Sequence, residues 1–193
     1  MSIQQFIEDN IDLIDNNNFT ELYNRCVSTD REQLTAVLYS CDINPLDYLT
    51  EIPEWFASRT NITSITIPDI VTRICWGAFS ECTSLTNVTI GNGVESIGSY
   101  AFYSCNNLTN VTVPSSVTYI GEGAFSSCTN LSDITIPNSV TSIRSYAFED
   151  CGNLQISYSG TKQQWKNLVT GKDIFVGTAY VCNCSDGVVE KSR

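Results

Sequence analysis

The residue types best suited to chemistry in this 193-residue chain are its nine cysteines, because the chain contains no histidine. Thiols can form disulfides, bind zinc or act as nucleophiles. A nucleophilic cysteine or serine is normally activated by a base such as histidine, and the chain also lacks a Gly-x-Ser-x-Gly motif. The sequence therefore predicts no nucleophilic catalysis.

Carboxylates are the other candidates for catalysis, since pairs of them hydrolyse glycosidic bonds by acid–base chemistry. Glu81, Glu122, Glu149 and Asp150 stand at variable positions of a segment that repeats along the chain. Charged side chains at such positions are typical of a solvated surface. We therefore favour surface charge over a small enzyme as their explanation.

Four of the cysteines recur at a spacing of 23 residues: Cys82, Cys105, Cys128 and Cys151. Zinc ligands instead come as close pairs that converge from a few loops. The closest pair, Cys182 and Cys184, falls in a predicted strand, where we expect the two thiols to point to opposite faces. We therefore expect no metal site and no cofactor.

Disulfides between neighbouring members of this cysteine series are within reach, because stacked strands lie about 4.8 Å apart. Side chains stacked in this way are parallel and face the core, however, which is the wrong relative geometry for a bridge. The number of cysteines is also odd. We expect these thiols to be reduced, buried and inert, and to pack as small hydrophobic groups.

The cysteine spacing belongs to a repeat that fills the middle of the chain. Four units begin at residues 62, 85, 108 and 131, and the third reads LTNVTVPSSVTYIGEGAFSSCTN. Nearly every apolar position recurs, including the Ala-Phe pair before each cysteine. A unit of this length cannot bury its own apolar side chains, so the period predicts a solenoid in which each unit packs on its neighbours.

Each unit predicts two short extended segments. LTNVTV alternates apolar and polar residues as a strand does, and Pro68, Pro114 and Pro137 end this strand because proline cannot continue the hydrogen-bonded ladder. A second extended piece such as VTYI follows, and a tight turn around GEGAF or GSYAF closes the unit. The stacked units should form a curved parallel sheet.

These units resemble the BspA-type leucine-rich repeat, whose pattern is roughly L-x-x-I-x-I-P-x-x-V-x-x-I-G-x-x-A-F-x-x-C, over residues 62–154. They depart from it at Gly91, which replaces the proline, and at Cys75 and Arg144, which replace the glycine. The resemblance implies a leucine-rich repeat solenoid, a coil of short strands and turns with a parallel β-sheet. It also implies protein binding, since proteins with this repeat resemble adhesins and other surface interaction proteins.

The segments on either side are expected to cap the solenoid, because its end faces are apolar. We assign residues 1–58 to an α-helical N-terminal cap, 59–154 to four repeats, and 155–193 to a variant C-terminal capping repeat. The first helix should carry its apolar side chains on one face, with Ser2 and Gln5 in a capping box. The residues of that face are Ile3, Phe6, Ile7, Ile11 and Ile14.

The rest of the N-terminal cap leads into the first repeat. Further helices are predicted at about 19–27, after Asp30, and from Pro45, because proline suits the first position of a helix. Phe56 is expected to take the place of the repeated phenylalanine. Arg59 then falls where the other units have cysteine.

The C-terminal segment, with GTKQQW and the later CSDG, resembles the variant unit that often finishes such arrays. The resemblance implies an added strand at 156–158 and a short helix capped by Thr161 and ending near Val169. It also implies an edge strand at 178–184, followed by a turn at Asp186-Gly187.

Two outward surfaces are candidates for binding a partner. The first strand of each unit exposes threonines with polar neighbours: Thr66, Asn87, Thr89, Asn110, Thr112, Asp133 and Thr135. Threonine favours strands and stacked hydroxyls can bond one another, so this row also has a purely structural explanation. The second surface is aromatic and gathers near the turns: Trp76, Tyr100, Tyr103, Tyr119 and Tyr146. Tyrosine and tryptophan are enriched at protein interfaces, and packing within each turn is the alternative explanation.

The net charge of −11 is concentrated in residues 1–60, which hold eleven acidic side chains and three arginines. No basic patch is visible, so we expect no nucleic-acid partner. No apolar run approaches the roughly 20 residues that span a bilayer, and the N-terminus lacks the basic start of a secretory signal. We therefore expect no membrane insertion and a cytoplasmic location, with attachment to a cell surface or virion by another route as the alternative.

These observations predict a non-catalytic, adhesin-like module that binds a protein of unknown identity. A rigid, slightly curved sheet that displays variable side chains suits such a role. A structural or phage-accessory protein is the alternative, and a small enzyme is a distant third.

Overall fold

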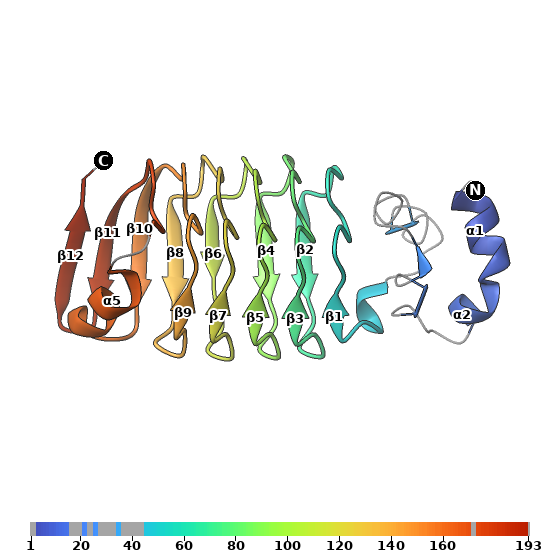
Figure 1. Cartoon of the computed structure of the whole chain (residues 1–193), viewed down its shortest axis with the longest axis horizontal. Coiled ribbons are helices and arrows are strands. Elements are labelled where there is room, and N and C mark those ends of the chain that lie inside the picture. Colours follow the sequence, from blue (N-terminus) through green and yellow to red (C-terminus); the bar gives the residue numbers. More distant parts are fainter. Residues whose placement is uncertain are drawn as a thin grey trace.

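The computed structural model describes residues 3–15, 21–22, 25–26, 34–35, 45–170 and 173–192. The repeats form a row of stacked coils (Figure 1). Helices α1 (Ile3–Asp9) and α2 (Ile11–Asp15) lie at one end of the row, and α5 (Lys162–Val169) lies at the other. None of the described helices is long and apolar enough to cross a membrane.

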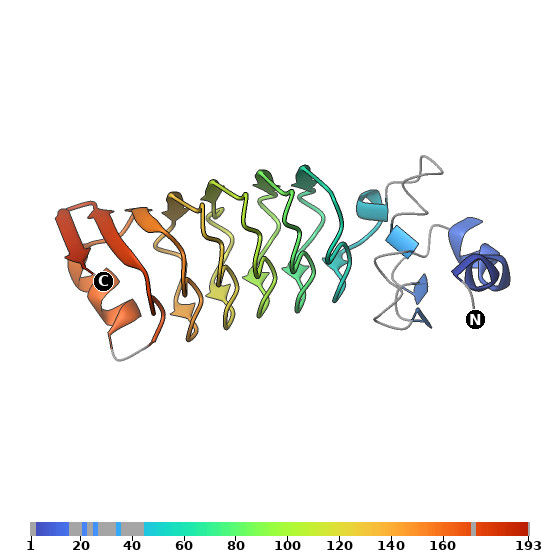
Figure 2. The same ribbon diagram turned by 90° about the horizontal axis from the view of Figure 1, so that it is seen from above.

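Each coil contributes to two rows of strands. The row here called the short-strand face consists of five parallel strands: β1 (Glu51–Ile52), β3 (Arg73–Ile74), β5 (Ser96–Ile97), β7 (Tyr119–Ile120) and β9 (Ser142–Ile143). The row here called the long-strand face consists of the following strands: β2 (Ser64–Ile67), β4 (Asn87–Ile90), β6 (Asn110–Thr112), β8 (Asp133–Ile136), β10 (Asn153–Tyr158), β11 (Ala179–Cys184) and β12 (Gly187–Lys191). Figure 2 shows the two rows on opposite sides of the coils.

The register of the strands places equivalent residues of successive coils beside each other. Ile97, for example, pairs with Ile74 on one side and with Ile120 on the other. In the long-strand face, β4 and β8 alternate exposed and buried residues, as period-two strands with one dry face do. The apolar side chains of both rows therefore meet in one continuous core between them.

The phenylalanines of the four Ala-Phe pairs, together with one from the C-terminal unit, form a column through this core. The column consists of Phe79, Phe102, Phe125, Phe148 and Phe175. Consecutive ring centroids lie 5.2 to 5.5 Å apart, and the ring planes are parallel to within 14°. This spacing allows offset stacking, so each ring is buried against the rings of the neighbouring coils.

The repeated cysteines are buried and free, as predicted. Each thiol also donates a hydrogen bond to a backbone carbonyl oxygen of the preceding coil, a contact that the sequence did not predict. The acceptor is Ala57 O for Cys82 and a phenylalanine carbonyl oxygen for the other three. Cys105 Sγ lies 3.2 Å from Phe79 O, and Cys128 Sγ lies 3.0 Å from Phe102 O. Burial raises the pKa of the Cys151 thiol to about 12. The thiols of Cys105, Cys128 and Cys151 therefore stay protonated near neutral pH, and the cysteine hydrogen bonds link one coil to the next.

The first coil follows a 22-residue spacing, which corrects the predicted alignment of Phe56. Ile52 pairs with Ile74, and the Ala57 N–H donates to Ala78 O as the Phe79 N–H donates to Ala101 O. Ala57 therefore takes the backbone place of the repeated phenylalanine. The Phe56 ring still reaches the column, but it meets Phe79 edge-on, at an interplanar angle of 75°.

The same shift shows that the prediction for Arg59 is wrong. Thr60 takes the cysteine position, and its hydroxyl lies 3.8 Å from Cys82 Sγ, while Arg59 forms an ion pair with Glu81. At the far end, the Thr178 hydroxyl donates to Phe148 O at 2.7 Å. A threonine thus ends the cysteine series at each side.

The N-terminal helix is broken, so the prediction of a single apolar face is wrong. Asn10 separates α1 from α2, and its side-chain amide donates to Phe6 O at 2.9 Å. The break leaves Ile11 51% exposed and Leu13 buried. A 3-10 helix, η2 (Pro45–Asp47), begins at Pro45 as predicted. The capping residue Ser2, and most residues of the helices predicted between 19 and 44, lie outside the described residues.

The C-terminal unit follows the prediction except at its edge. Thr161 caps α5 with a complete capping box, and Trp165 of this helix is buried against Phe175 and Tyr180. The predicted strand and turn near the end are present, but β11 is not an edge strand. The turn at Ser185 and Asp186 reverses the chain, and β12 pairs antiparallel with β11.

Removal of one ring from the column should destabilise the protein. We expect Phe102→Ala to lower the free energy of unfolding by about 3–5 kcal/mol, because the ring is fully buried and stacked on both sides. Urea denaturation followed by circular dichroism measures this change. Thr112→Ala, on the exposed side of β6, is the control and should cost less than about 1 kcal/mol. An equal loss for both variants would contradict the stacked column.

The thiols should differ in their reactivity in the folded protein. We expect Cys105 and Cys128 to be alkylated at least about 100-fold more slowly than the half-buried Cys75 and Cys184, because reaction at a buried thiol requires opening of the core. Site-resolved mass spectrometry of pulse-labelled protein reads each rate, with urea-unfolded protein as the reference. Rapid labelling of Cys105 in the native state would show that the coil interior is open.

Candidate functional site

The predicted threonine row lies on the outside of the long-strand face. Thr66 stands beside Thr89, and Thr112 beside Thr135, and all four are exposed. A second exposed row carries the predicted polar neighbours Asn87, Asn110 and Asp133. The backbone pairing beneath these rows is interrupted between β4 and β6, which lie side by side but belong to different hydrogen-bonded sheets.

The predicted aromatic residues separate into a cluster and two isolated side chains. The Trp76 ring lies 5.9 Å from that of Tyr100, which lies 6.0 Å from that of Tyr103. Tyr119 and Tyr146 stand apart on later coils, and both are exposed. The structure thus brings three of the five predicted aromatic residues together.

Trp55 completes this aromatic cluster and was not predicted. Its ring lies 4.4 Å from that of Trp76 and covers Gly77, while the ring of Tyr100 covers Gly123. Both glycines have positive φ angles, and a Cβ on Gly123 would lie 2.5 Å from the Tyr100 ring. The alternation of aromatic residue and glycine at this position therefore has a packing cause. Trp55 could have been found in the sequence by the 22-residue spacing that separates it from Gly77.

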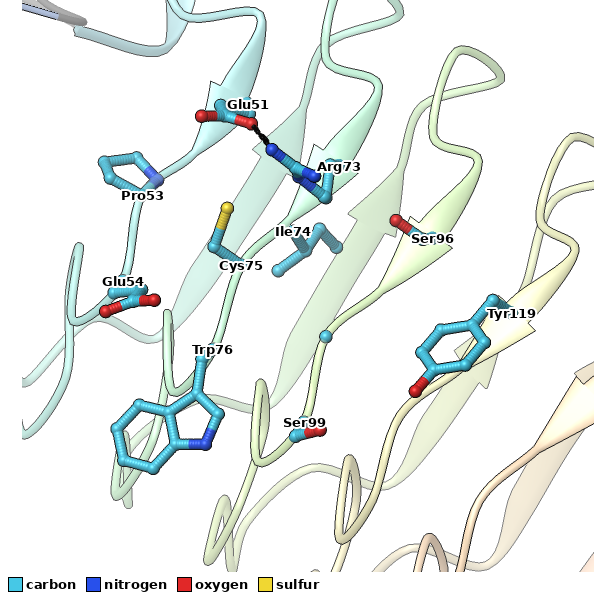
Figure 3. Close-up of a pocket in the computed structure, with 11 residues that line it drawn as sticks. Glu51, Pro53, Glu54, Arg73, Ile74, Cys75, Trp76, Ser96, Ser99 and Tyr119 are labelled. Carbon is cyan, nitrogen blue, oxygen red and sulfur yellow. Dashed lines mark hydrogen bonds and ion pairs between the residues drawn. The ribbon is translucent and has the colours of Figure 1, made fainter.

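A groove of about 600 Å³ crosses the short-strand face (Figure 3). Trp76 and Tyr119 stand on opposite sides of it, and between them lies the intervening coil with Ser96, Gly98 and Ser99. Trp76 is 39% exposed and Tyr119 is 36% exposed. The groove therefore has two aromatic borders and a floor of small residues.

Charged groups occupy the Trp76 end of the groove. Arg73 and Glu51 form an ion pair on neighbouring strands, and the Arg73 Nε lies 3.0 Å from Glu51 Oε2. Glu54 adds a second carboxylate, and the half-buried thiol of Cys75 lies between these groups in Figure 3. Burial, then the charge of Glu51, raise the pKa of Cys75, although the neighbouring guanidinium opposes this change. The groove thus combines stacking surfaces with carboxylates and one neutral thiol.

The closest cysteine pair differs from its prediction. Side chains two residues apart in a strand share a face, so Cys182 and Cys184 point to the same side of β11, and their sulfur atoms lie 3.7 Å apart. The prediction of opposite faces is therefore wrong. In the described part of the chain, no group of three or more His, Cys, Asp or Glu side chains is arranged to hold a metal ion.

The effect of the groove's charged groups on Cys75 can be measured from the pH dependence of its alkylation. We expect its alkylation by iodoacetamide to rise at a pH above the ordinary thiol pKa, and Glu51→Gln to move the midpoint downward. The substitution removes a repelling carboxylate and leaves the Arg73 guanidinium beside the thiol. Peptide mass spectrometry across a pH series measures both midpoints, with Asp133→Asn as the matched control on the other face. A midpoint unchanged by Glu51→Gln would contradict this description of the site.

Known proteins share this architecture. The BspA type leucine rich repeat region matches residues 50–168 in six copies. No curated protein matches the chain. A leucine rich cell surface protein from Faecalibacterium prausnitzii is 30% identical, with a TM-score of 0.60 over 65% of this chain and 34% of that protein. The pneumococcal vaccine antigen PcpA is 15% identical, with a TM-score of 0.57 over 76% of this chain and 40% of that protein, and this likeness concerns the fold alone.

The matched region includes the coil around β1, which lies within residues 1–58 that the sequence assigned to the N-terminal cap. The matched part of this chain spans less than half the length of each of the two solved proteins. The repeat nevertheless covers most of the present sequence, and the coils show its two rows of strands. The chain belongs to the BspA type leucine rich repeat family.

Proposed function

We propose that the chain is a non-catalytic protein-binding module and that it binds through the groove on the short-strand face. The observation that carries this proposal is the exposure of Trp76 and Tyr119 at the borders of one groove. Large aromatic side chains that are accessible on a rigid surface are the residues that most often dominate the energy of protein interfaces.

The two faces of the solenoid differ in how much they vary from coil to coil. At one position of the short-strand face, successive coils carry Glu51, Arg73, Ser96, Tyr119 and Ser142. The long-strand face instead repeats threonine, for which strand preference already gives a reason. Varied side chains on a regular frame support the short-strand face as the binding surface. The threonine row remains the second candidate.

The groove's titratable groups favour binding over catalysis. The Glu51 carboxylate is held by Arg73, and the Cys75 thiol has a raised pKa and so carries little of the reactive thiolate near neutral pH. Leucine-rich repeat proteins commonly bind other proteins. The F. prausnitzii relative is described as a cell surface protein, which supports an adhesin-like role for the present chain.

The proposal can be tested by capture of partners with the intact chain. We expect the Trp76→Ala/Tyr119→Ala variant to capture at least about tenfold less of each specifically enriched protein. The reason is that removal of each anchor costs an interface more than about 1 kcal/mol of binding free energy. Thr89→Ala/Thr112→Ala on the long-strand face is the matched control and should retain them. Quantitative mass spectrometry of proteins captured from a lysate of the source cells gives the comparison.

Both variants alter exposed side chains, and circular dichroism with urea denaturation verifies that each is folded. Equal capture by the native chain and both variants would contradict binding through the groove. Loss of capture with the threonine variant alone would transfer the binding site to the long-strand face.

A further inference from the structure

The groove has an excess of negative charge. Among the lining residues that the structure describes, Glu51 and Glu54 are acidic, and Arg73 is the one cation. Both Nε and Nη2 of Arg73 contact the Glu51 carboxylate, so this cation is already engaged within the protein. An anionic ligand would therefore meet carboxylates without a guanidinium available to bind it.

A further carboxylate, that of Glu122, lies on the coil of Tyr119, outside the residues that line the groove. Glu122 occupies the coil position equivalent to that of Ser99, one coil further along, and its Oε1 lies 3.1 Å from the Tyr100 hydroxyl. Burial first, and then the bond and charge of Glu122, raise the pKa of Tyr100. Carboxylates therefore lie in or near the groove on more than one coil.

The aromatic borders are suited to hold a positive group. Trp76 belongs to the β3 coil and Tyr119 to the β7 coil, so one intervening coil separates them, and stacked strands place these two levels about 10 Å apart. The intervening floor residues Ser96, Gly98 and Ser99 are small. This leaves room for one extended side chain between the rings. The faces of tryptophan and tyrosine attract ammonium and guanidinium groups.

We propose that the groove binds a lysine or arginine side chain from an extended segment of the partner protein, with its charge directed to the carboxylates. This inference rests on the proposed function and specifies the chemistry of the partner. The net charge of −11 on the chain also attracts a positively charged partner at longer range. A neutral saccharide, which also stacks on aromatic rings, would not require the carboxylates.

The test uses the full chain and two fluorescein-labelled peptides. One has the sequence Gly-Arg-Gly-Arg-Gly-Arg-Gly, and the other carries citrulline, the uncharged analogue, in place of each arginine. Fluorescence anisotropy measures binding at low and high salt. We expect the arginine peptide to bind at least about tenfold more tightly than the citrulline peptide, and its affinity to fall between about 50 and 500 mM NaCl.

Variants separate the groove from the general acidity of the chain. Trp76→Ala should lower the affinity for the arginine peptide by about fivefold, which is the loss expected for one cation–π contact. Glu54→Gln should weaken it by about threefold, while Asp133→Asn, an equal charge change on the long-strand face, should change it by less than about 1.5-fold. Cellohexaose, a neutral oligosaccharide, is added as a competitor and should not displace the peptide.

Three results would overturn the inference: no binding of the arginine peptide, equal binding of the citrulline peptide, or equal effects of Glu54→Gln and Asp133→Asn. Displacement by the oligosaccharide would assign the groove to sugars instead. These failures differ from failure of the proposed function. Partners lost with Trp76→Ala/Tyr119→Ala would still show that the groove binds protein even if the peptides do not bind.

Discussion

Each coil of this solenoid buries its phenylalanine ring only by stacking it on the rings of the coils before and after it. Two sets of contacts join the units across the core. One is the column of stacked rings from Phe79 to Phe175, and the other is the hydrogen bond that each repeated cysteine thiol donates to the preceding coil. A single unit would leave these apolar side chains in water, so the repeats are stable only as an array. The end coils must then differ from the inner ones. Thr60 and Thr178 end the cysteine series, and Trp165 covers the last coil.

The same stacking of coils determines how the exposed side chains are arranged on the surface. Because strands pair in register from coil to coil, equivalent outward positions form straight rows, and any change of residue type along a row becomes a local surface feature. The groove arises in this way, where small residues on the β5 coil lie between Trp76 and Tyr119. The core therefore keeps the same residue types from coil to coil, while the short-strand face carries the variation that the proposed binding would use.

Most of the fold could be predicted from the sequence, because the period of 23 residues repeats in every buried position. The sequence did not reveal where that period changes. The first coil is one residue shorter, so Thr60 and not Arg59 takes the cysteine position. Asn10 breaks the N-terminal helix, although the spacing of the apolar residues alone predicts a continuous one. The groove could not be predicted either. It is lined by side chains from β1, β3, β5 and β7, which are far apart along the chain. The stacking of the coils brings these side chains together, and their distances across the face cannot be read from the sequence.

We propose that the short-strand face is the surface that meets the partner. Photo-cross-linking tests it most directly, with a benzophenone amino acid replacing Tyr119 in one protein and Thr112 in another. These two residues lie on the same coil turn but on opposite faces. We expect covalent capture of the partner from position 119 and not from position 112. Capture from position 112 alone would contradict binding through the short-strand face.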